Sequence, residues 1–459
     1  MFPPMPPPLA PLPALLFNVP PQEAGSFTSN DVAIIGGGFS ALATLANIVQ
    51  RRDKPMSICV VARGGLRDFG PAYSTPRHEH LLNVRAGGMS LWLDNPAHFA
   101  EWCKAEGIDG ASPAAFMPRV VYHKYLQEIL DSTLALAKEK FITVTVLDDV
   151  AVAVNSGYAV SLQSGRIVQA KHIVLALGNS LRAQQQADIA GLVTDPWHYD
   201  YTQLPANGAV AVIGSGLTAV DAMISLLTAG WQGKIICLSG HALLPRPHLD
   251  MVDATRMPKL MAQDFVDKPL SKLLHNLRAV AKPLGAEWPY AIDALRPLTQ
   301  IIWRNLAPHD RTRLAGRHFA LWNIHRHRAA PEIYRQLDAA MKRGQLQLVK
   351  AHATGYAPEN GGIKISLQRG NHMHVDRAFV CTGIGYGAGE NPLLRAMMQA
   401  SLLPQDGMTA DETFRVGGTE SRGIYALGAP LFGQLFETTA VPELRMQADK
   451  IARVLAAHI

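Results

Sequence analysis

The chain has 459 residues, of which 48% are apolar and 17% are charged, and its formal net charge is +6. This composition excludes a disordered chain and a coiled coil, and the length predicts two to four domains. No stretch of about 18 apolar residues is free of proline and charge, so we expect no membrane partner and a cytoplasmic location.

Residues 1–30 form a leader in which proline recurs every two or three positions. Proline at that density prevents a helix. The leader also contains no Lys or Arg, which the first part of a signal peptide requires. We predict a polyproline-like segment that is not a targeting signal.

The first nucleotide-binding motif follows the leader. An apolar run at residues 32–35 predicts a buried parallel strand, and GGGFSA (residues 36–41) leads from it into a periodic helix. In this G-x-G-x-x-A pattern Gly36 forms the tight turn and Gly38 lets a pyrophosphate approach the backbone. The helix start at Phe39 and Ser40 offers free N–H groups to the phosphates.

The second strand of this unit is predicted at residues 57–61, and Ala62 and Arg63 follow it. An acidic residue normally binds the adenosine ribose at this place, and none is present. We therefore expect Arg63 to contact a phosphate.

Four cysteines are widely separated, with no C-x-x-C pair and no zinc-like His/Cys spacing: Cys59, Cys103, Cys237 and Cys381. This spacing argues against a disulfide framework, a metal site and a local dithiol redox pair. Three of them lie in apolar runs, which predicts buried, inert thiols in a reducing compartment.

The motif recurs about 180 residues later. GSGLTA (residues 214–219) lies between an apolar strand and a helix, which makes Gly214, Ser215, Gly216, Leu217 and Thr218 candidate cofactor contacts. Two such units in one chain predict that FAD and NAD(P)H bind together.

The second strand of the second unit leads into Ser239, Gly240 and His241, and Arg246 and His248 follow. Hydroxyl, imidazole and guanidinium groups suit a 2′-phosphate, so we expect NADPH rather than NADH, with His241 and Arg246 at the phosphate.

Residues 250–343 read as short helices separated by prolines, an insertion expected to cover the active site. Residues 241–330 carry 14 Lys and Arg against 7 Asp and Glu. A basic lining for an anionic cofactor or substrate explains this excess, and a solvated helical surface is the alternative. No motif supports a nucleic-acid partner.

Two apolar runs that end in glycine, at residues 173–179 and 378–385, are typical of strands where a chain leaves and re-enters a nucleotide-binding domain. The first adds Gly178 to the cofactor candidates. We expect strands at residues 345–348 and 362–367 to resume the second sheet, and a helix at 438–456 interrupted by Pro442.

Together these features predict an α/β protein with two Rossmann-like dinucleotide-binding domains, the second inserted in the first and carrying a helical cap. The FAD domain comprises residues 31–204 and 376–459, and the NAD(P)H domain comprises residues 205–375 with its insertion at about 250–343.

The chain resembles a bacterial family of FAD/NAD(P)-binding proteins related to flavin-dependent, N-hydroxylating monooxygenases. The matching segments are residues 69–73, 80–84, 89–90, 118–122, 244–248, 322–328 and 437–445. The resemblance implies FAD, NADPH and O₂ as reactants, with a C4a-hydroperoxyflavin oxidising a small-molecule substrate. Anionic amines and amino acids belong to the substrate class that the resemblance implies.

The resemblance also implies roles for individual residues. It places the loop with Leu82, Asn83 and Met89 beside the flavin, where Asn83 bonds the flavin or the NADPH ribose unless it only forms a turn. It places His325 or Arg326 near the flavin or nicotinamide as catalytic groups, with helix capping as the alternative.

In related two-domain flavoproteins the strand that ends here at Gly428 cradles the ribityl chain. Ala429 follows Gly428 in this chain, where an Asp often stands. Glu437 and Thr438 are compatible with a flavin-facing role and equally with ordinary helix capping.

The predicted activity is that of an FAD- and NADPH-dependent monooxygenase. A flavin reductase, dehydrogenase or oxidase that oxygenates no substrate remains an alternative. A nucleotide-binding scaffold without turnover is the other, because both usual acidic residues are missing.

Overall fold

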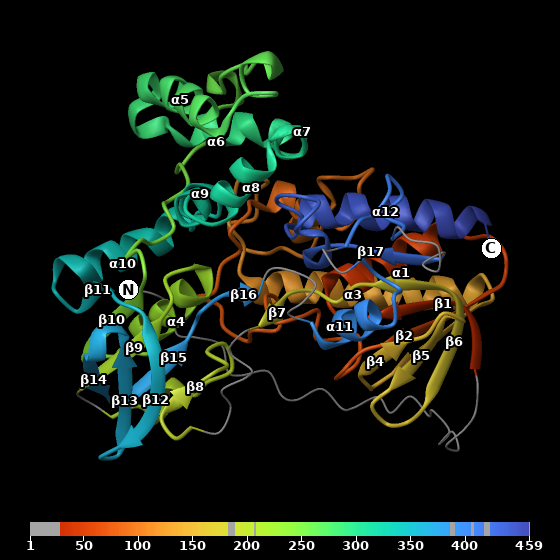
Figure 1. The fold of residues 1–459 in the computed structure, drawn as a ribbon, viewed down its shortest axis with the longest axis horizontal. Helices are drawn as coiled ribbons and strands as arrows, with labels where there is room; N and C mark the ends of the chain where they lie inside the picture. The colour runs from red at the N-terminus through yellow and green to blue at the C-terminus, as the bar shows by residue number, and fades with distance from the viewer. Residues whose placement is uncertain are drawn as a thin grey trace.

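The computed structural model describes residues 28–181, 189–205, 208–385, 391–404, 408–416 and 423–458, so the predicted leader lies almost wholly outside the described residues. Two parallel-stranded α/β units lie side by side, and a group of short helices stands above them (Figure 1). No helix in these ranges combines the length and apolarity needed to cross a membrane.

The sheet of the first unit has the order β3-β2-β1-β6-β5-β4, and β17 pairs with β6. Neighbours from β3 to β6 are parallel, β17 is parallel to β6, and β4 and β5 add an antiparallel edge. The strands are Thr28–Ile35 (β1), Met56–Val61 (β2), Ile142–Leu147 (β3), Ala151–Val154 (β4), Ala159–Leu162 (β5), Ile167–Leu175 (β6) and Ile424–Ala426 (β17).

Helix α1 (Phe39–Arg51) is the central helix of this unit. Every residue from 39 to 49 is buried, because α3 (Arg119–Glu139) and α12 (Val441–His458) both pack against α1. Smaller helices of the unit are α2 (His98–Ala105) and α11 (Pro392–Gln399).

Helix α12 begins at Val441, three residues later than predicted, and Pro442 lies in its first turn instead of interrupting it. Proline suits that position because the first N–H groups of a helix have no intrahelical partner.

The second sheet has the order β11-β10-β9-β15-β8 and is entirely parallel. Its strands are Leu192–Val193 (β8), Ala209–Ile213 (β9), Lys234–Ser239 (β10), Leu346–Lys350 (β11) and Arg377–Val380 (β15), with helices α4 (Leu217–Thr228) and α10 (Pro331–Lys342) packed on it. The predicted boundaries give β8 and β15 to the first unit. Both hydrogen-bond to the second sheet, because β15 pairs with β9 as β6 pairs with β1.

Residues 362–367 do form a strand, but the prediction that it resumes the second sheet is wrong. Strand β13 (Gly362–Leu367) pairs antiparallel with β12 (Ala353–Glu359) and β14 (His372–Val375) in a separate three-stranded sheet. A short antiparallel pair, β7 (Ser180–Leu181) with β16 (Ile384–Gly385), joins the two segments in which the chain passes from one unit to the other.

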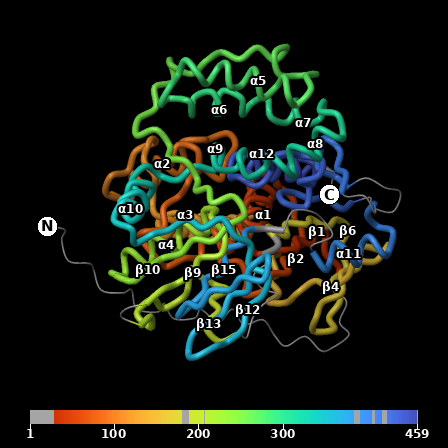
Figure 2. The backbone as a smooth tube through the Cα atoms, turned by 60° about the vertical axis from the view of Figure 1, so that its left-hand side comes forward, coloured from red at the N-terminus to blue at the C-terminus, as the bar shows by residue number. Residues whose placement is uncertain are grey.

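The predicted helical insertion is confirmed as a cap of short helices: α5 (Leu270–Ala281), α6 (Pro289–Leu295), α7 (Thr299–Asn305), α8 (Pro308–Ala315) and α9 (Phe319–Arg326). Proline occupies the first turn of α6 and α8, in keeping with the prediction that prolines divide this segment into short helices. The cap has its own apolar core, which includes Phe436 from the loop before α12. Figure 2 shows the cap helices above α12. The cap therefore sits on the first unit, although the second unit carries it in sequence.

Candidate cofactor and active site

The two glycine turns have the same geometry. Gly36 has φ +126° and its N–H donates to the Val61 carbonyl at 2.9 Å, while Gly214 has φ +110° and donates to Leu238 at 2.7 Å. A Cβ at Gly36 would overlap the carbonyl oxygen of Ala176, and a Cβ at Gly214 would overlap that of Cys381. Only glycine fits either turn.

Both turns also leave room for a phosphate group. Gly38 and Gly216 precede the first residues of α1 and α4, and neither helix has a side-chain cap. No atom lies within 4 Å of a Cβ placed on Gly216, and the nearest to one on Gly38 is the Phe69 oxygen at 3.5 Å. Uncapped N–H groups beside an open glycine fit the pyrophosphate of a dinucleotide.

The residues after the second strand of each unit are mostly exposed. Arg63, His241 and Arg246 are all at the surface, where a cofactor phosphate can reach them. His248 is instead half-buried, and its Nε2 lies 3.0 Å from the Asn83 carbonyl oxygen. Burial, assisted by the charge of Arg328, lowers the pKa of His248 to about 3. His248 thus joins the two units and does not face the ribose position.

A glutamine that sequence analysis missed connects Gly428 with Thr438. The Gly428 N–H donates to Gln447 Oε1 at 2.8 Å, and Gln447 Nε2 donates to the buried Thr438 hydroxyl at 2.7 Å. Gly428 has φ +78°, and a Cβ there would lie 3.9 Å from Ser40 Oγ. The end of β17 is therefore held against the start of α1.

Glu437 holds the cap against the loop before α12. Trp322 Nε1 donates to Glu437 Oε1 at 2.6 Å, and Arg326 Nε lies 2.5 Å from Oε2. His327 Nε2 lies 3.6 Å from Oε1, and burial lowers the pKa of His327 although the carboxylate opposes the effect. Glu437 adopts a left-handed backbone, φ +60°, which the surrounding contacts must stabilise.

The two predicted catalytic cations point to different partners. Arg326 is buried against Glu437, whereas His325 Nδ1 bonds the Leu321 carbonyl of its own helix at 2.7 Å. The rings of Trp288 and His325 pack against each other edge to face, with their centroids 4.9 Å apart. Arg326 therefore forms an ion pair with Glu437, and His325 has a contact within its own helix, as the capping alternative predicts.

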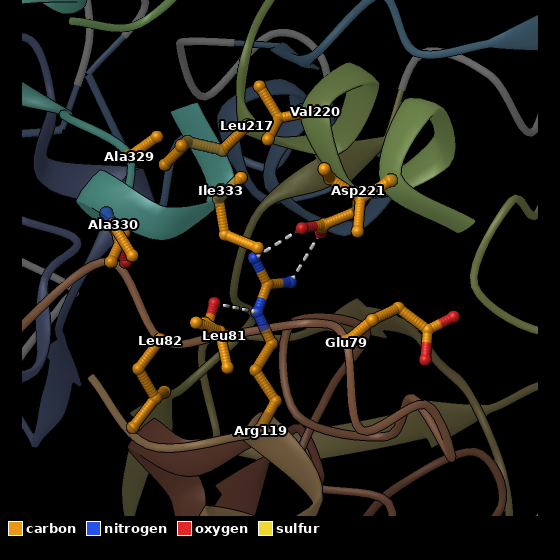
Figure 3. A pocket seen from close by; sticks show the side chains of 12 residues that line it. Glu79, Leu81, Leu82, Arg119, Leu217, Val220, Asp221, Ala329, Ala330 and Ile333 are labelled. Atoms are coloured by element: carbon orange, nitrogen blue, oxygen red, sulfur yellow. Dashed lines mark hydrogen bonds and ion pairs between the residues drawn. The ribbon is translucent and has the colours of Figure 1, made fainter. Parts of the chain in front are cut away.

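A narrow pocket lies in the seam between the two units (Figure 3). Leu82 and Asn83 line it from the first unit and Leu217 from the start of α4, so three predicted residues meet there. Met89, a few residues after Asn83 in the sequence, is buried. Thr218 is only partly buried. Gly178 has φ +64°, and no atom lies within 4 Å of a Cβ placed on it. The pocket itself has room for about one water molecule.

A buried ion pair crosses the same seam. Arg119 NH1 lies 2.7 Å from Asp221 Oδ2, and Trp197 Nε1 also donates to that oxygen at 2.9 Å. His80 Nε2 reaches Ser225 Oγ at 2.8 Å, and burial lowers the pKa of His80. Residues from the first unit, the connecting segment and α4 are thereby joined in one network.

Several buried polar groups have unused hydrogen-bonding capacity, and they include Tyr122 and Arg445, which sequence analysis did not assign. Within the described part of the chain, the Tyr122 hydroxyl and Arg445 Nε have no hydrogen-bond partner. Arg445 NH1 donates to the Ser90 carbonyl at 3.2 Å, which places it beside the Met89 loop. Buried polar atoms are rarely left unpaired, so these two fit a bound polar cofactor.

All four cysteines are free and buried, and burial was predicted for three of them: Cys59, Cys237 and Cys381. Burial raises the pKa of the Cys59 and Cys237 thiols to about 12, and that of Cys103 to about 11. Thiols with such pKa values stay protonated and do not act as redox nucleophiles.

Residues 33–180 match the sequence profile of a family described as FAD-NAD(P)-binding, in agreement with the first predicted unit. A search of the curated proteins finds no significant match.

Comparison with solved structures finds the same fold over most of the chain. An ornithine N-hydroxylase from Kutzneria sp. 744, solved with reduced FAD, NADP⁺ and L-ornithine, has a TM-score of 0.62 at 16% identity, over 94% of this chain and 99% of that one. Ornithine hydroxylase from Pseudomonas aeruginosa has a TM-score of 0.63 at 15% identity, over 94% and 100%. Bacillithiol disulfide reductase from Staphylococcus aureus has a TM-score of 0.52 at 12% identity, over 94% and 99%. The predicted fold class is thus confirmed.

Proposed function

We propose that the protein is an FAD- and NADPH-dependent monooxygenase that N-hydroxylates a small amine or amino acid in the cytoplasm. The observation that carries the proposal is the pair of matched glycine turns at Gly36 and Gly214, one in each α/β unit of a chain whose cysteines are all buried. A disulfide reductase of this fold needs an accessible dithiol, so the likeness to the ornithine hydroxylases is the better guide to the chemistry.

In this proposal the first unit holds FAD. Gly36, Gly38 and the uncapped start of α1 bind its pyrophosphate, and Gly428 and Thr438, tied together by Gln447, border its ribityl chain. Tyr122 and Arg445 supply hydrogen bonds near the ring system, since each has a buried polar atom to offer.

The second unit binds NADPH through Gly214, Gly216 and the start of α4. When both cofactors are bound, FAD reduced by NADPH supplies the chemistry that activates O₂. The residues of the chain position the reactants and exclude water: the cap, held by Glu437 to the loop before α12, covers the first unit.

The substrate class rests on charge. The buried Arg326 and Arg328 are already paired with Glu437 and Asp293. The remaining excess of Lys and Arg in residues 241–330 makes the cap cationic, and a cationic surrounding favours a substrate with a carboxylate. An amino acid whose side chain ends in an amine combines a carboxylate with a group that can be hydroxylated.

The test follows the flavin spectrum of the purified protein as isolated, after anaerobic NADPH and after air, and also measures the products formed in air. NADPH added anaerobically should bleach a yellow holoenzyme, and air with a panel of diamino acids and amines should then give hydroxylamine product in proportion to NADPH consumed. Peroxide released in full whatever amine is present would instead assign an oxidase or reductase. A colourless protein that FAD cannot reconstitute would refute the enzyme altogether.

A further inference from the structure

The ribose-reading position of each unit can be compared through its hydrogen bonds. The turn glycine donates to Val61 in the first unit and to Leu238 in the second, so these two residues are equivalent. Val61 is in register with Leu147 on β3, and Leu238 with Val349 on β11. The next residue along the third strand is Asp148 in the first unit and Lys350 in the second. One structural position therefore carries opposite charges.

Both side chains share a sheet face with the glycine turn. Ser239 is in register with Lys350, and Ser215 Oγ of the turn donates to Ser239 Oγ at 3.0 Å. In the first unit the equivalent of Ser239 is Ala62, whose Cβ lies 2.8 Å from a Cβ placed on Gly37 of the turn. Residues in register project to the same face of a sheet, so Asp148 and Lys350 lie beside the cofactor positions.

Further contacts place these residues at the second-strand loops that normally hold the discriminating residue. Asp148 Oδ1 accepts a hydrogen bond from the Gly64 N–H at 2.8 Å, which leaves its other oxygen for a ligand. A Cβ at Gly240 would overlap the imidazole of His352, two residues after Lys350. Lys350 is exposed, and no described carboxylate forms an ion pair with it.

We propose that the third strand, and not the second, selects the ribose in both units. Asp148 accepts hydrogen bonds from the adenosine ribose hydroxyls of FAD, and Lys350 with His352 binds the 2′-phosphate of NADPH. This inference rests on the proposed binding of the two cofactors. It accounts for the missing acids after Val61 and Leu238, because a carboxylate is supplied from β3 where a diol binds, and a cation from β11 where a phosphate binds.

The test measures NADP⁺ and NAD⁺ affinity of the FAD-loaded protein by calorimetry. Lys350→Ala should weaken NADP⁺ binding about tenfold or more and leave NAD⁺ binding unchanged, since only one of them has the 2′-phosphate. Lys350→Arg should keep the preference. The matched control is Lys234→Ala, at the opposite end of the neighbouring strand β10, which should change neither affinity.

The first unit is tested through FAD affinity of the apoprotein, followed by flavin fluorescence. Asp148→Asn should weaken FAD binding about tenfold, whereas Asp53→Asn should not, because Asp53 is an exposed acid before β2, at the opposite end of the strands.

The outcomes separate this inference from the proposed function. Equal losses for NADP⁺ and NAD⁺ in Lys350→Ala, or no loss, would overturn the assignment of Lys350 while cofactor binding stands. A wild-type protein that binds neither dinucleotide would overturn the proposed function and this inference with it.

Discussion

The two nucleotide-binding units share one turn and differ in what encloses it. In the first unit α1 is buried from its first residue, because α12 returns from the end of the chain to cover it. In the second unit the first two residues of α4 are only partly buried. An enclosed site suits a cofactor that stays bound, and an open one suits a cofactor that must exchange in every turnover. The burial around the motif therefore distinguishes the two sites better than the motif does.

Alanine at the turn glycines tests this difference most strongly. Gly36→Ala places a Cβ against the Ala176 oxygen, at a strained φ in the core of the first unit. It should lower the free energy of unfolding by roughly 4 kcal/mol and abolish flavin binding. Gly214→Ala makes the same clash with Cys381, yet it should remove NADP⁺ binding and leave the flavin content near that of the wild type. Flavin content, melting temperature and calorimetry read out the contrast. Loss of flavin in Gly214→Ala would contradict independent sites.

The ion pair across the seam tests whether the units are fixed relative to each other. Arg119→Met leaves the Asp221 carboxylate buried and unpaired, and should destabilise the protein by about 3 kcal/mol. The thermal unfolding midpoint measures this loss. Asp131→Asn, which breaks an exposed pair with Arg67, is the control and should change stability by less than about 0.5 kcal/mol. Equal effects would mean that the seam is not a rigid joint.

The local parts of this architecture could be predicted, and the long-range parts could not. The glycine turns follow from sterics within a few residues, so Gly36 and Gly214 were found from sequence. The proline spacing likewise predicted the short helices of the cap. The partners of Glu437 and Thr438 lie on α9 and α12, and nothing local to either residue indicates them.

The same limit explains the other differences. Strand β15 joins the second sheet through its register with β9, which the apolar run alone cannot specify. Tyr122 and Arg445 lay in segments recognised by resemblance, but their significance comes from burial without partners. No periodicity in the sequence predicts that.

The contact between the cap and the loop before α12 should contribute less to stability than the ion pair across the seam. When the Glu437 charge is removed, Trp322 Nε1 and Arg326 Nε can still donate hydrogen bonds to the side chain that replaces it. Glu437→Gln should keep the Trp322 bond but leave Arg326 buried without its counterion, at a cost of about 2 kcal/mol. Limited proteolysis of the cap should accelerate accordingly. The exposed pair of Asp338 with Lys342 provides the control, Asp338→Asn, which should leave the cleavage rate unchanged. An unaltered rate in Glu437→Gln would show that the apolar core around Phe436 holds the cap without help.

His248 gives an effect that depends on pH. Its pKa is about 3 in the folded protein and about 6.5 when unfolded, so the unfolded chain binds more protons between these values. The stabilisation is complete above about pH 6.5 and is lost as the pH falls toward 3. The loss at pH 5 is about 2 kcal/mol. His80 and His327, whose pKa values are also lowered, act in the same direction.

His248→Gln should therefore reduce the stability difference between pH 7 and pH 5 by about 2 kcal/mol, as measured by urea unfolding at both pH values. His309→Gln, at an exposed position, should leave that difference intact. Because His248 bonds the Asn83 carbonyl across the seam, an unchanged difference in His248→Gln would mean that the units separate from each other before they unfold.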